Sequence, residues 1–228
     1  MTAKDAHPDP VLVVGAGLSG LMAARDLTTA GLPVRIVDKG RSVGGRLATR
    51  RIGPATLDHG AQFFTVRSEE LAADVEAWST AGVVDVWCEG FTEIDGYPRY
   101  RTAGGMSQLA KYLATDLDIL TGVRAQAVIP DEDHWMLTYD GAIREPDPAA
   151  AVVLTAPVPQ SLEILASGGV SISADHEGLT ELAYHRVIAL LTTTNVPVPL
   201  ESPGALQQPD DPTFSFISDN QAKGISSE

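Results

Sequence analysis

Residues 10–20, PVLVVGAGLSG, decide the fold of this chain. The run over residues 10–15 is apolar and rich in β-branched side chains, which predicts a strand buried on both faces. A Gly-x-Gly-x-x-Gly pattern follows at once, and apolar residues at helical spacing then predict a helix over 18–30 that ends at Gly31. Residues 34–38 (VRIVD) predict a second buried strand, so the stretch forms a compact strand–helix–strand unit.

The glycine-rich loop of this unit predicts a binding site for a dinucleotide. Glycines allow a tight turn and a close approach of the backbone, so that unpaired N–H groups at the helix start can bind an anionic diphosphate. Asp38 ends the second strand, where its carboxylate can accept hydrogen bonds from ribose hydroxyls and disfavours the 2′-phosphate of NADP. The candidate binding residues of the loop are Gly15, Ala16, Gly17 and Gly20.

Residues 39–51, KGRSVGGRLATRR, hold five of the 16 basic residues of the chain. One interpretation is a solvated basic loop. We favour a second clamp on the diphosphate, because a glycine pair adjoins an arginine. Gly44 and Gly45 would let the backbone approach, and Arg46 would give charge-assisted hydrogen bonds. Lys39 opens the stretch and is a candidate binding residue with them.

Residues 38–51 followed by residues 58–64 (DHGAQFF) resemble the renalase-like flavoproteins, within the amine-oxidase-type FAD superfamily. The resemblance continues through residues 97–113, 153–160 and 214–221, and so spans nearly the whole chain. It implies FAD as cofactor and a small-molecule substrate, a misformed isomer of a dihydro-nicotinamide dinucleotide. It also implies that O2 reoxidises the reduced flavin and gives H2O2. The FAD contacts that it implies beyond the glycines are Ser19, Arg46, Gln62, Phe63 and the strand near Ala125, which would lie against the adenine.

The fold expected from these segments is α/β. A Rossmann-like FAD-binding domain would be interleaved with a mixed α+β substrate domain that contains an antiparallel sheet. The FAD-binding domain is expected over residues 1–67 and 98–164. The substrate domain, which would be incomplete, is expected over residues 68–97 and 165–228.

Further elements follow from local patterns. Ser68 predicts the N-cap of an amphipathic helix that ends before Gly82, and a second helix is expected near residues 106–113. Residues 128–139 predict a hairpin. Its acidic tip, residues 130–133, could be read as a metal site, but adjacent carboxylates and one histidine define no geometry, so we favour a solvated turn.

The remaining segments predict strands and loops. Residues 83–101 predict short strands and turns, and residues 184–194 (YHRVIALLTTT) predict a long strand of the substrate domain. Residues 196–212 hold five of the 15 prolines, which predicts an irregular loop that could cover a site.

Composition excludes several classes of function. A net charge of −14 argues against nucleic acid and anionic membranes as partners. The single cysteine, Cys88, excludes an internal disulfide and is better explained as a small buried residue than as a nucleophile. The polar start of the chain lacks the apolar stretch of a signal peptide, and no apolar run approaches 18 residues, so a cytoplasmic protein is expected.

Two alternatives to the renalase-like function stay open. One is an amine or polyene oxidase on the same scaffold. The other is a non-catalytic fragment that binds FAD poorly, because the Gly-Asp motif that relatives carry near the flavin is missing and the chain resembles about two thirds of a family member. No catalytic residue is predicted, since hydride transfer to a flavin needs no acid or base on the protein. For His59 we favour a structural role over proton transfer, and the histidines and cysteine show no metal-ligand spacing.

Overall fold

The computed structural model describes residues 9–91, 96–141 and 144–227. The chain divides into two compact units, each made from two stretches. The first unit comprises Met1–Gly45 and Leu113–Val187, and the second comprises Arg46–Tyr112 and Ile188–Glu228.

The unit boundaries lie elsewhere than those of the predicted domains. Residues 46–67 and 98–112, predicted in the FAD-binding domain, lie in the second unit, where they contact the C-terminal stretch. Residues 165–187, predicted in the substrate domain, lie in the first unit, because Tyr184 and η1 (Ala174–Glu181) contact the helix before them. The assignment of an FAD-binding and a substrate function to separate parts of the chain stays a prediction.

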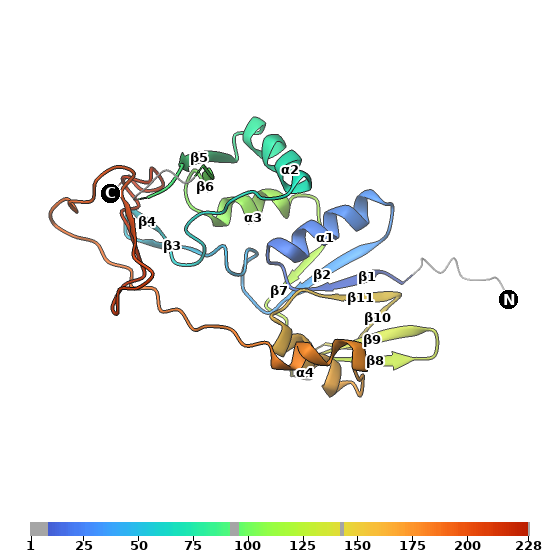
Figure 1. Cartoon of the computed structure of the whole chain (residues 1–228). Coiled ribbons are helices and arrows are strands. Elements are labelled where there is room, and N and C mark those ends of the chain that lie inside the picture. The colour runs from blue at the N-terminus through green and yellow to red at the C-terminus, as the bar shows by residue number, and fades with distance from the viewer. Residues whose placement is uncertain (1–8, 92–95, 142–143, 228) are drawn as a thin grey trace. The chain divides into compact units, whose positions relative to one another are not determined.

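A four-stranded parallel sheet organises the first unit (Figure 1). The strand order is β11 (Ala151–Leu154), β1 (Val11–Val14), β2 (Val34–Asp38), β7 (Ile119–Thr121). Helix α1 (Leu18–Thr29) connects β1 to β2, and Gly31 follows it with a positive φ of 83°. The predicted strand–helix–strand unit is therefore confirmed, and the fold is α/β and Rossmann-like.

A second layer lies on the face of the parallel sheet opposite α1, as Figure 1 shows. It is an antiparallel sheet of β8 (Ala125–Asp131), β9 (His134–Tyr139) and β10 (Asp147–Ala149), flanked by α4 (Val158–Ser167). The hairpin predicted over residues 128–139 is thus confirmed as β8–β9. Apolar side chains of both layers form one core, which includes Leu12, Val14, Val37, Val128, Leu137 and Ile164.

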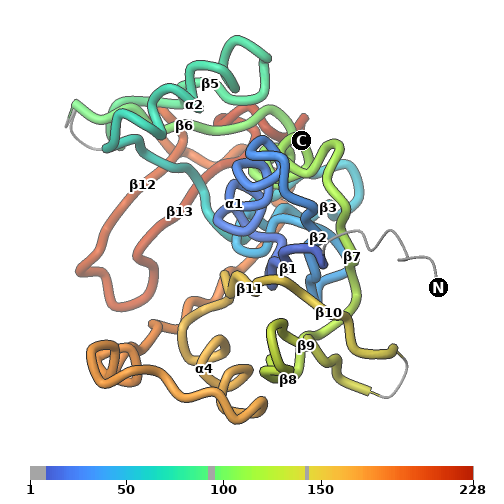
Figure 2. Tube along the Cα trace, turned by 90° about the vertical axis from the view of Figure 1, so that its right-hand side faces the viewer, coloured from blue at the N-terminus to red at the C-terminus, as the bar shows by residue number. Residues whose placement is uncertain are grey.

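The described residues of the second unit form three two-stranded antiparallel pairs and two helices. The pairs are β3 (Thr49–Ile52) with β4 (Ala55–Asp58), β5 (Val84–Cys88) with β6 (Arg99–Thr102), and β12 (Ala205–Gln207) with β13 (Phe216–Ser218). The helices are α2 (Glu69–Thr80) and α3 (Ser107–Leu113), whose last residue already belongs to the first unit. Figure 2 shows β12 and β13 running side by side as a hairpin. Ser68 caps α2 as predicted, since its Oγ accepts a hydrogen bond from the Leu71 N–H.

Two predictions for the C-terminal third were wrong. Residues 184–194 form no strand in the structure, and Val187, Ile188 and Leu190 are 75–95% exposed. The apolar pattern predicted a strand, but a strand needs a hydrogen-bonded neighbour, and none of the described residues supplies one. Residues 196–212, predicted as an irregular loop, contain the short strand β12.

The described helices are all too short or too polar to cross a bilayer. Residues 1–8, which are most of the polar start of the chain, and residues 92–95, within the predicted turns of residues 83–101, lie outside the described residues.

Candidate functional site

Three glycines shape the loop between β1 and α1, and they do so for different reasons. Gly15 has a φ of 114°, and a Cβ there would lie 2.6 Å from the Thr155 Oγ1. A Cβ at Gly20 would overlap the Gly15 carbonyl oxygen. Gly17 has an extended backbone, and a Cβ there would meet no atom within 4 Å. The fold itself requires Gly15 and Gly20, whereas Gly17 borders open space.

At the start of α1, no described residue accepts a hydrogen bond from the first main-chain N–H groups of the helix. The first hydrogen bond of the helix runs from the Leu21 N–H to the Gly17 carbonyl oxygen, so the preceding amides have no acceptor within the helix. Gly17 is the N-cap residue, so no side chain caps the helix start. The first turn holds no acidic residue. Ser19 lies exposed in this turn. An anion would find both N–H donors and the positive end of the helix dipole here.

Helix α2 shows the opposite arrangement at its own start. The Ser68 side chain caps it, and Glu69 and Glu70 occupy its first turn. These groups satisfy the helix start internally, which leaves little for an external anion. The start of α1, unlike that of α2, is therefore open to an external anion.

Asp38 fixes the glycine-rich loop from the end of β2. Its Oδ2 accepts a hydrogen bond of 2.6 Å from the Ala16 N–H, and its Oδ1 accepts one of 2.6 Å from the Gly40 N–H. Each carboxylate oxygen retains a second acceptor site. The predicted ribose-binding residue is therefore also the residue that holds two loops together.

The second glycine pair lies against the first loop. The Gly44 N–H donates to the Ala16 carbonyl oxygen at 2.8 Å, and Gly44 pairs with Gly17 as an isolated parallel bridge. Gly45 has a φ of 52°, and a Cβ there would lie 3.4 Å from the Gly17 Cα. The sequence predicted that residues 39–51 clamp the same ligand as the first loop. The structure places Gly44 and Gly45 of this stretch against that loop.

Lys39 directly follows Asp38 at the end of β2, and Ala125 begins β8. The Lys39 Nζ donates to the Gln160 Oε1 at 3.0 Å on an exposed surface. Ala125 is buried at the start of β8, where it pairs with Tyr139. The Val123 N–H donates to the Asp38 carbonyl oxygen, which brings the turn before Ala125 to the end of β2.

Thr155 belongs to the loop cluster, although no sequence motif predicted it there. It follows β11, and its Oγ1 donates to the Val14 carbonyl oxygen at 3.0 Å. The same hydroxyl fills the space beside Gly15. Its position after a buried strand was a usable signal, because the carboxyl ends of parallel strands meet at one edge of a sheet.

The other three predicted contacts, Arg46, Gln62 and Phe63, lie in the second unit. The Arg46 carbonyl oxygen accepts a hydrogen bond of 2.8 Å from the Ala61 N–H, and a Cβ at Gly60 would overlap that oxygen. The two segments that carry the family resemblance therefore pack together at their main chains. The Arg46 side chain is exposed, and Gln62 is half-buried.

Phe63 belongs to an aromatic cluster of the second unit. Its ring centroid lies 5.1 Å from that of Phe91, 6.1 Å from that of Phe216 and 6.4 Å from that of Trp87. The Arg99 guanidinium lies 5.6 Å from the Phe63 ring centroid. His59, by contrast, is exposed, and its main-chain N–H donates to the Ala48 carbonyl oxygen.

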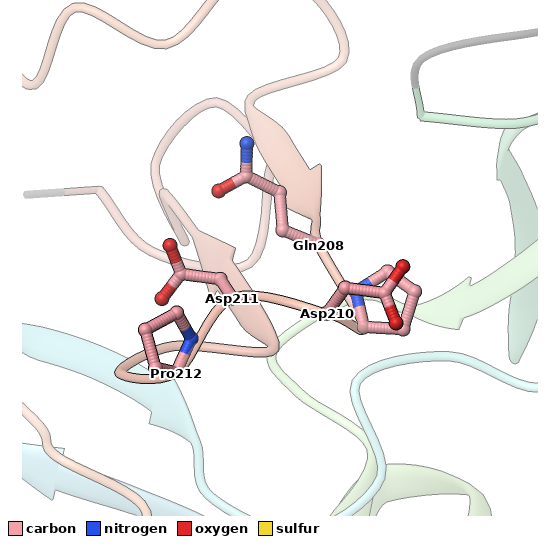
Figure 3. A pocket seen from close by; sticks show the side chains of 5 residues that line it. Gln208, Asp210, Asp211 and Pro212 are labelled. Atoms are coloured by element: carbon pink, nitrogen blue, oxygen red, sulfur yellow. The ribbon is translucent and has the colours of Figure 1, made fainter.

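A shallow pocket occurs at the turn between β12 and β13 and is lined by residues 208–212. Figure 3 shows Gln208, Asp210 and Asp211 spread around this turn rather than directed at a common point. The Asp211 carboxylate accepts hydrogen bonds from the Thr213 and Phe214 N–H groups, so it stabilises the turn. The described residues include no group of three or more His, Cys, Asp or Glu side chains that could hold a metal ion.

The loop cluster of the first unit fits the diphosphate and ribose of a dinucleotide such as FAD. The fit rests on two observations: the open space at Gly17, which a Cβ would fill, and the unused amides beside it. Asp38 adds acceptors of the kind that ribose hydroxyls need. This donor and acceptor set suits a nucleotide.

Comparison with known proteins gives matches to parts of the chain. Residues 13–77 match the family model of the NAD(P)-binding Rossmann-like domain. A putrescine oxidase of Kocuria rosea is 42% identical over 66 residues, which are 29% of this chain and 14% of that protein. A protein named as a flavin-containing monoamine oxidase in Mycobacterium tuberculosis is 45% identical over 63 residues, which are 28% of this chain and 14% of that protein.

The solved structure of wild-type putrescine oxidase bound to putrescine extends the likeness. It has a TM-score of 0.61 and 16% sequence identity, and the match covers 76% of this chain and 63% of that one. At this identity the likeness shows the fold alone, and that fold agrees with the Rossmann-like layers described above. The matched segment spans only 14% of the length of each of the two curated relatives.

Proposed function

We propose that this chain belongs to the superfamily of amine-oxidase-type FAD/NAD(P)-binding oxidoreductases, that it binds FAD and that it acts in FAD-dependent oxidation; the similarities to a Rossmann-like family model and to two flavin-type oxidases support the proposal. One observation carries the proposal: two glycine-rich segments lie side by side at the uncapped start of α1. A diphosphate needs such a place, because its negative charge must meet main-chain N–H donors that no side chain has already used.

The residues of the proposed site have distinct roles. The amides at the start of α1 hold the diphosphate, and Gly17, Gly44 and Gly45 let it approach the backbone. Asp38 keeps the loop in shape and accepts hydrogen bonds from the ribose. Proposed further contacts are Ser19, Lys39, Ala125, Arg46, Gln62 and Phe63, the last three on the resemblance of their segments to renalase-like flavoproteins.

The proposed chemistry is hydride transfer, for which the flavin supplies the acceptor. On the resemblance of residues 38–51 and 58–64, the substrate is a dihydro-nicotinamide dinucleotide isomer, and O2 is the final electron acceptor that yields H2O2. The chain's own residues bind and orient in this reaction, and none of them has to transfer a proton.

A second candidate substrate class is an amine, and the similarity to putrescine oxidase favours it. The two substrate classes are distinguished by which compound reduces the flavin of the FAD-loaded protein. Anaerobic addition of dihydro-nicotinamide isomers bleaches the flavin on the first proposal, whereas addition of an amine such as putrescine bleaches it on the second. Bleaching by a polyene would instead indicate a polyene oxidase on the same scaffold.

The decisive experiment is a titration of the purified protein with FAD, followed by visible absorption and by quenching of flavin fluorescence. Saturable binding with a defined dissociation constant is expected, and FMN, which lacks the adenylate half of FAD and therefore the diphosphate, should bind far more weakly. A folded protein that takes up no FAD would overturn the proposal. Equal affinity for FMN and FAD would show that the glycine-rich loops do not bind the diphosphate of FAD.

A further inference from the structure

The second unit contains a buried polar centre at Asp58, the last residue of β4. Its Oδ1 accepts hydrogen bonds from the Thr49 Oγ1 at 2.6 Å and from the Met106 N–H at 2.9 Å. Its Oδ2 accepts a hydrogen bond of 2.7 Å from the Lys223 Nζ, and both side chains of this ion pair are 0% exposed. Asp58 thus joins β3, β4, the start of α3 and the C-terminal stretch.

Residues 218–226, which we term the anchor segment, bind β4 at two further points. The Asp58 N–H donates to the Asn220 Oδ1 at 3.3 Å, and the Thr56 N–H donates to the Ser226 Oγ at 3.0 Å. Burial lowers the pKa of the Lys223 ammonium, and the adjacent Asp58 carboxylate opposes that shift. Three contacts along one strand hold the anchor segment in a single register.

The first residue of the anchor segment contacts Gln62. The Gln62 Nε2 donates to the Asp58 carbonyl oxygen at 2.8 Å and to the Gly60 carbonyl oxygen at 3.4 Å. The Gln62 Oε1 lies 3.0 Å from the Ser218 Oγ. A carbonyl oxygen can only accept, so the amide nitrogen must face Asp58, and the Ser218 hydroxyl must donate to the amide oxygen.

This arrangement fixes the orientation of the Gln62 carboxamide and leaves one acceptor site on its Oε1. Without the Ser218 hydroxyl, no described group would hold the oxygen end, and the amide could turn about its last side-chain bond. The Asp58 carbonyl oxygen holds the Nε2 end of the Gln62 carboxamide. The Asp58 carboxylate binds Lys223 and thereby holds the anchor segment, whose Ser218 holds the Oε1 end.

We infer that Ser218 is a positioning residue for Gln62, held in place by the anchor segment, and that Gln62 thereby offers an acceptor to an N–H or O–H donor of FAD. The inference rests on the proposed function, because Gln62 is one of the proposed FAD contacts. It assigns a role to a part of the chain far from the glycine-rich loops in the sequence.

The test compares variants of equal shape at position 218 in the full chain. Ser218→Thr keeps the hydroxyl, and Ser218→Val has the same shape without it. Ser215→Ala is the control, because Ser215 directly precedes the same strand, β13, and is exposed. Gln62→Ala is the reference. The readouts are the FAD dissociation constant, the visible spectrum of bound flavin and the thermal unfolding temperature without FAD.

Ser218→Val is expected to weaken FAD binding roughly 3- to 10-fold, as for the loss of one neutral hydrogen bond. It should also shift the flavin spectrum as Gln62→Ala does. Ser218→Thr and Ser215→Ala should match the wild type in both readouts. In the double variant, Ser218→Val should add nothing to Gln62→Ala, because one residue acts through the other.

Two outcomes would contradict the inference in distinguishable ways. If Ser218→Val lowers the unfolding temperature but keeps the affinity and spectrum of Ser218→Thr, Ser218 is structural only, and the inference fails alone. If Ser218→Val and Gln62→Ala add fully in the double variant, the coupling is absent. A wild-type protein that binds no FAD overturns the proposed function and, with it, this inference.

Discussion

Gly17 is the residue at which the fold and the proposed site make different demands. Its backbone is extended, so an alanine could adopt it, and a Cβ would meet no protein atom within 4 Å. The glycine is therefore not needed for folding. What it leaves open is space beside the unused amides of α1, which is where the diphosphate is proposed to lie.

Gly17→Ala should accordingly weaken FAD binding without unfolding the protein. We expect a loss of about 1.5–3 kcal/mol, the range for hydrogen bonds to charged groups, measured as the dissociation constant by FAD titration. Gly178→Ala is the matched control, because a Cβ at Gly178 also meets nothing within 4 Å. Gly20→Ala should instead lower the unfolding temperature, since its Cβ would overlap the Gly15 carbonyl oxygen. Equal affinity of Gly17→Ala and wild type would place the diphosphate elsewhere.

Arg46 allows a second test at the level of a single side chain. Arg46→Ala should weaken FAD binding by about 1.5–3 kcal/mol if the guanidinium makes a charge-assisted bond to the diphosphate. Arg50→Ala is the control, because Arg50 is exposed and belongs to the same basic stretch. Isothermal titration at two salt concentrations separates a specific bond from general attraction. Equal losses in both variants would reduce residues 39–51 to a solvated basic loop.

At the level of elements, a polar contact ties β9 to β10 beside Ala125. The Tyr139 hydroxyl donates to the Asp147 Oδ2 at 2.5 Å, and the Arg144 guanidinium binds the same carboxylate at 2.8 Å. Burial, followed by the hydrogen bond and the charge of Asp147, raises the pKa of Tyr139 above its ordinary value of 10.0. This contact makes the stability of the first unit depend on pH in the alkaline range.

The sign of that dependence follows from proton binding. Above pH 10.0, the ordinary pKa of tyrosine, the unfolded chain releases the Tyr139 proton while the folded chain keeps it. The folded state then binds more protons, so the free energy of unfolding falls as pH rises. Urea unfolding of the wild type at increasing pH should show this fall, and Tyr139→Phe should show a smaller one. If the free energy of unfolding fell equally with pH in the wild type and in Tyr139→Phe, Tyr139 would not be the cause of the pH dependence.

Local patterns predicted those elements whose partners are close in the sequence. The β1–α1–β2 unit, the Ser68 cap and the β8–β9 hairpin each depend on neighbouring residues, and each was predicted correctly. The glycines and Asp38 were found because their spacing reflects one loop. Thr155 and Lys223 were missed because their contacts join residues 140 or more positions apart. A local sequence pattern does not predict contacts between residues so far apart, because only the folded chain brings them together.

At the level of the whole molecule, residues 184–194 connect the two units. The apolar, β-branched pattern of this segment predicts a strand, yet the structure shows an extended chain with Val187 and Ile188 at 88% and 95% exposure. Its side chains and backbone lie open, and residues 184–190 are all exposed. A segment of this kind is the preferred target of a protease, because cleavage requires an extended, accessible backbone.

Limited proteolysis with trypsin should therefore cut after Arg186 early in the time course. The bonds after Arg99 and Lys223 should survive longest, because both side chains are buried. Mass spectrometry of the first fragments identifies the sites, and Arg186→Gln should remove the early cut without changing the others. Early cleavage would confirm that the strand pattern has no partner in this chain. Protection of residues 184–194 would instead mean that the segment pairs as a strand in solution, as its sequence predicts, through an arrangement that the described structure lacks.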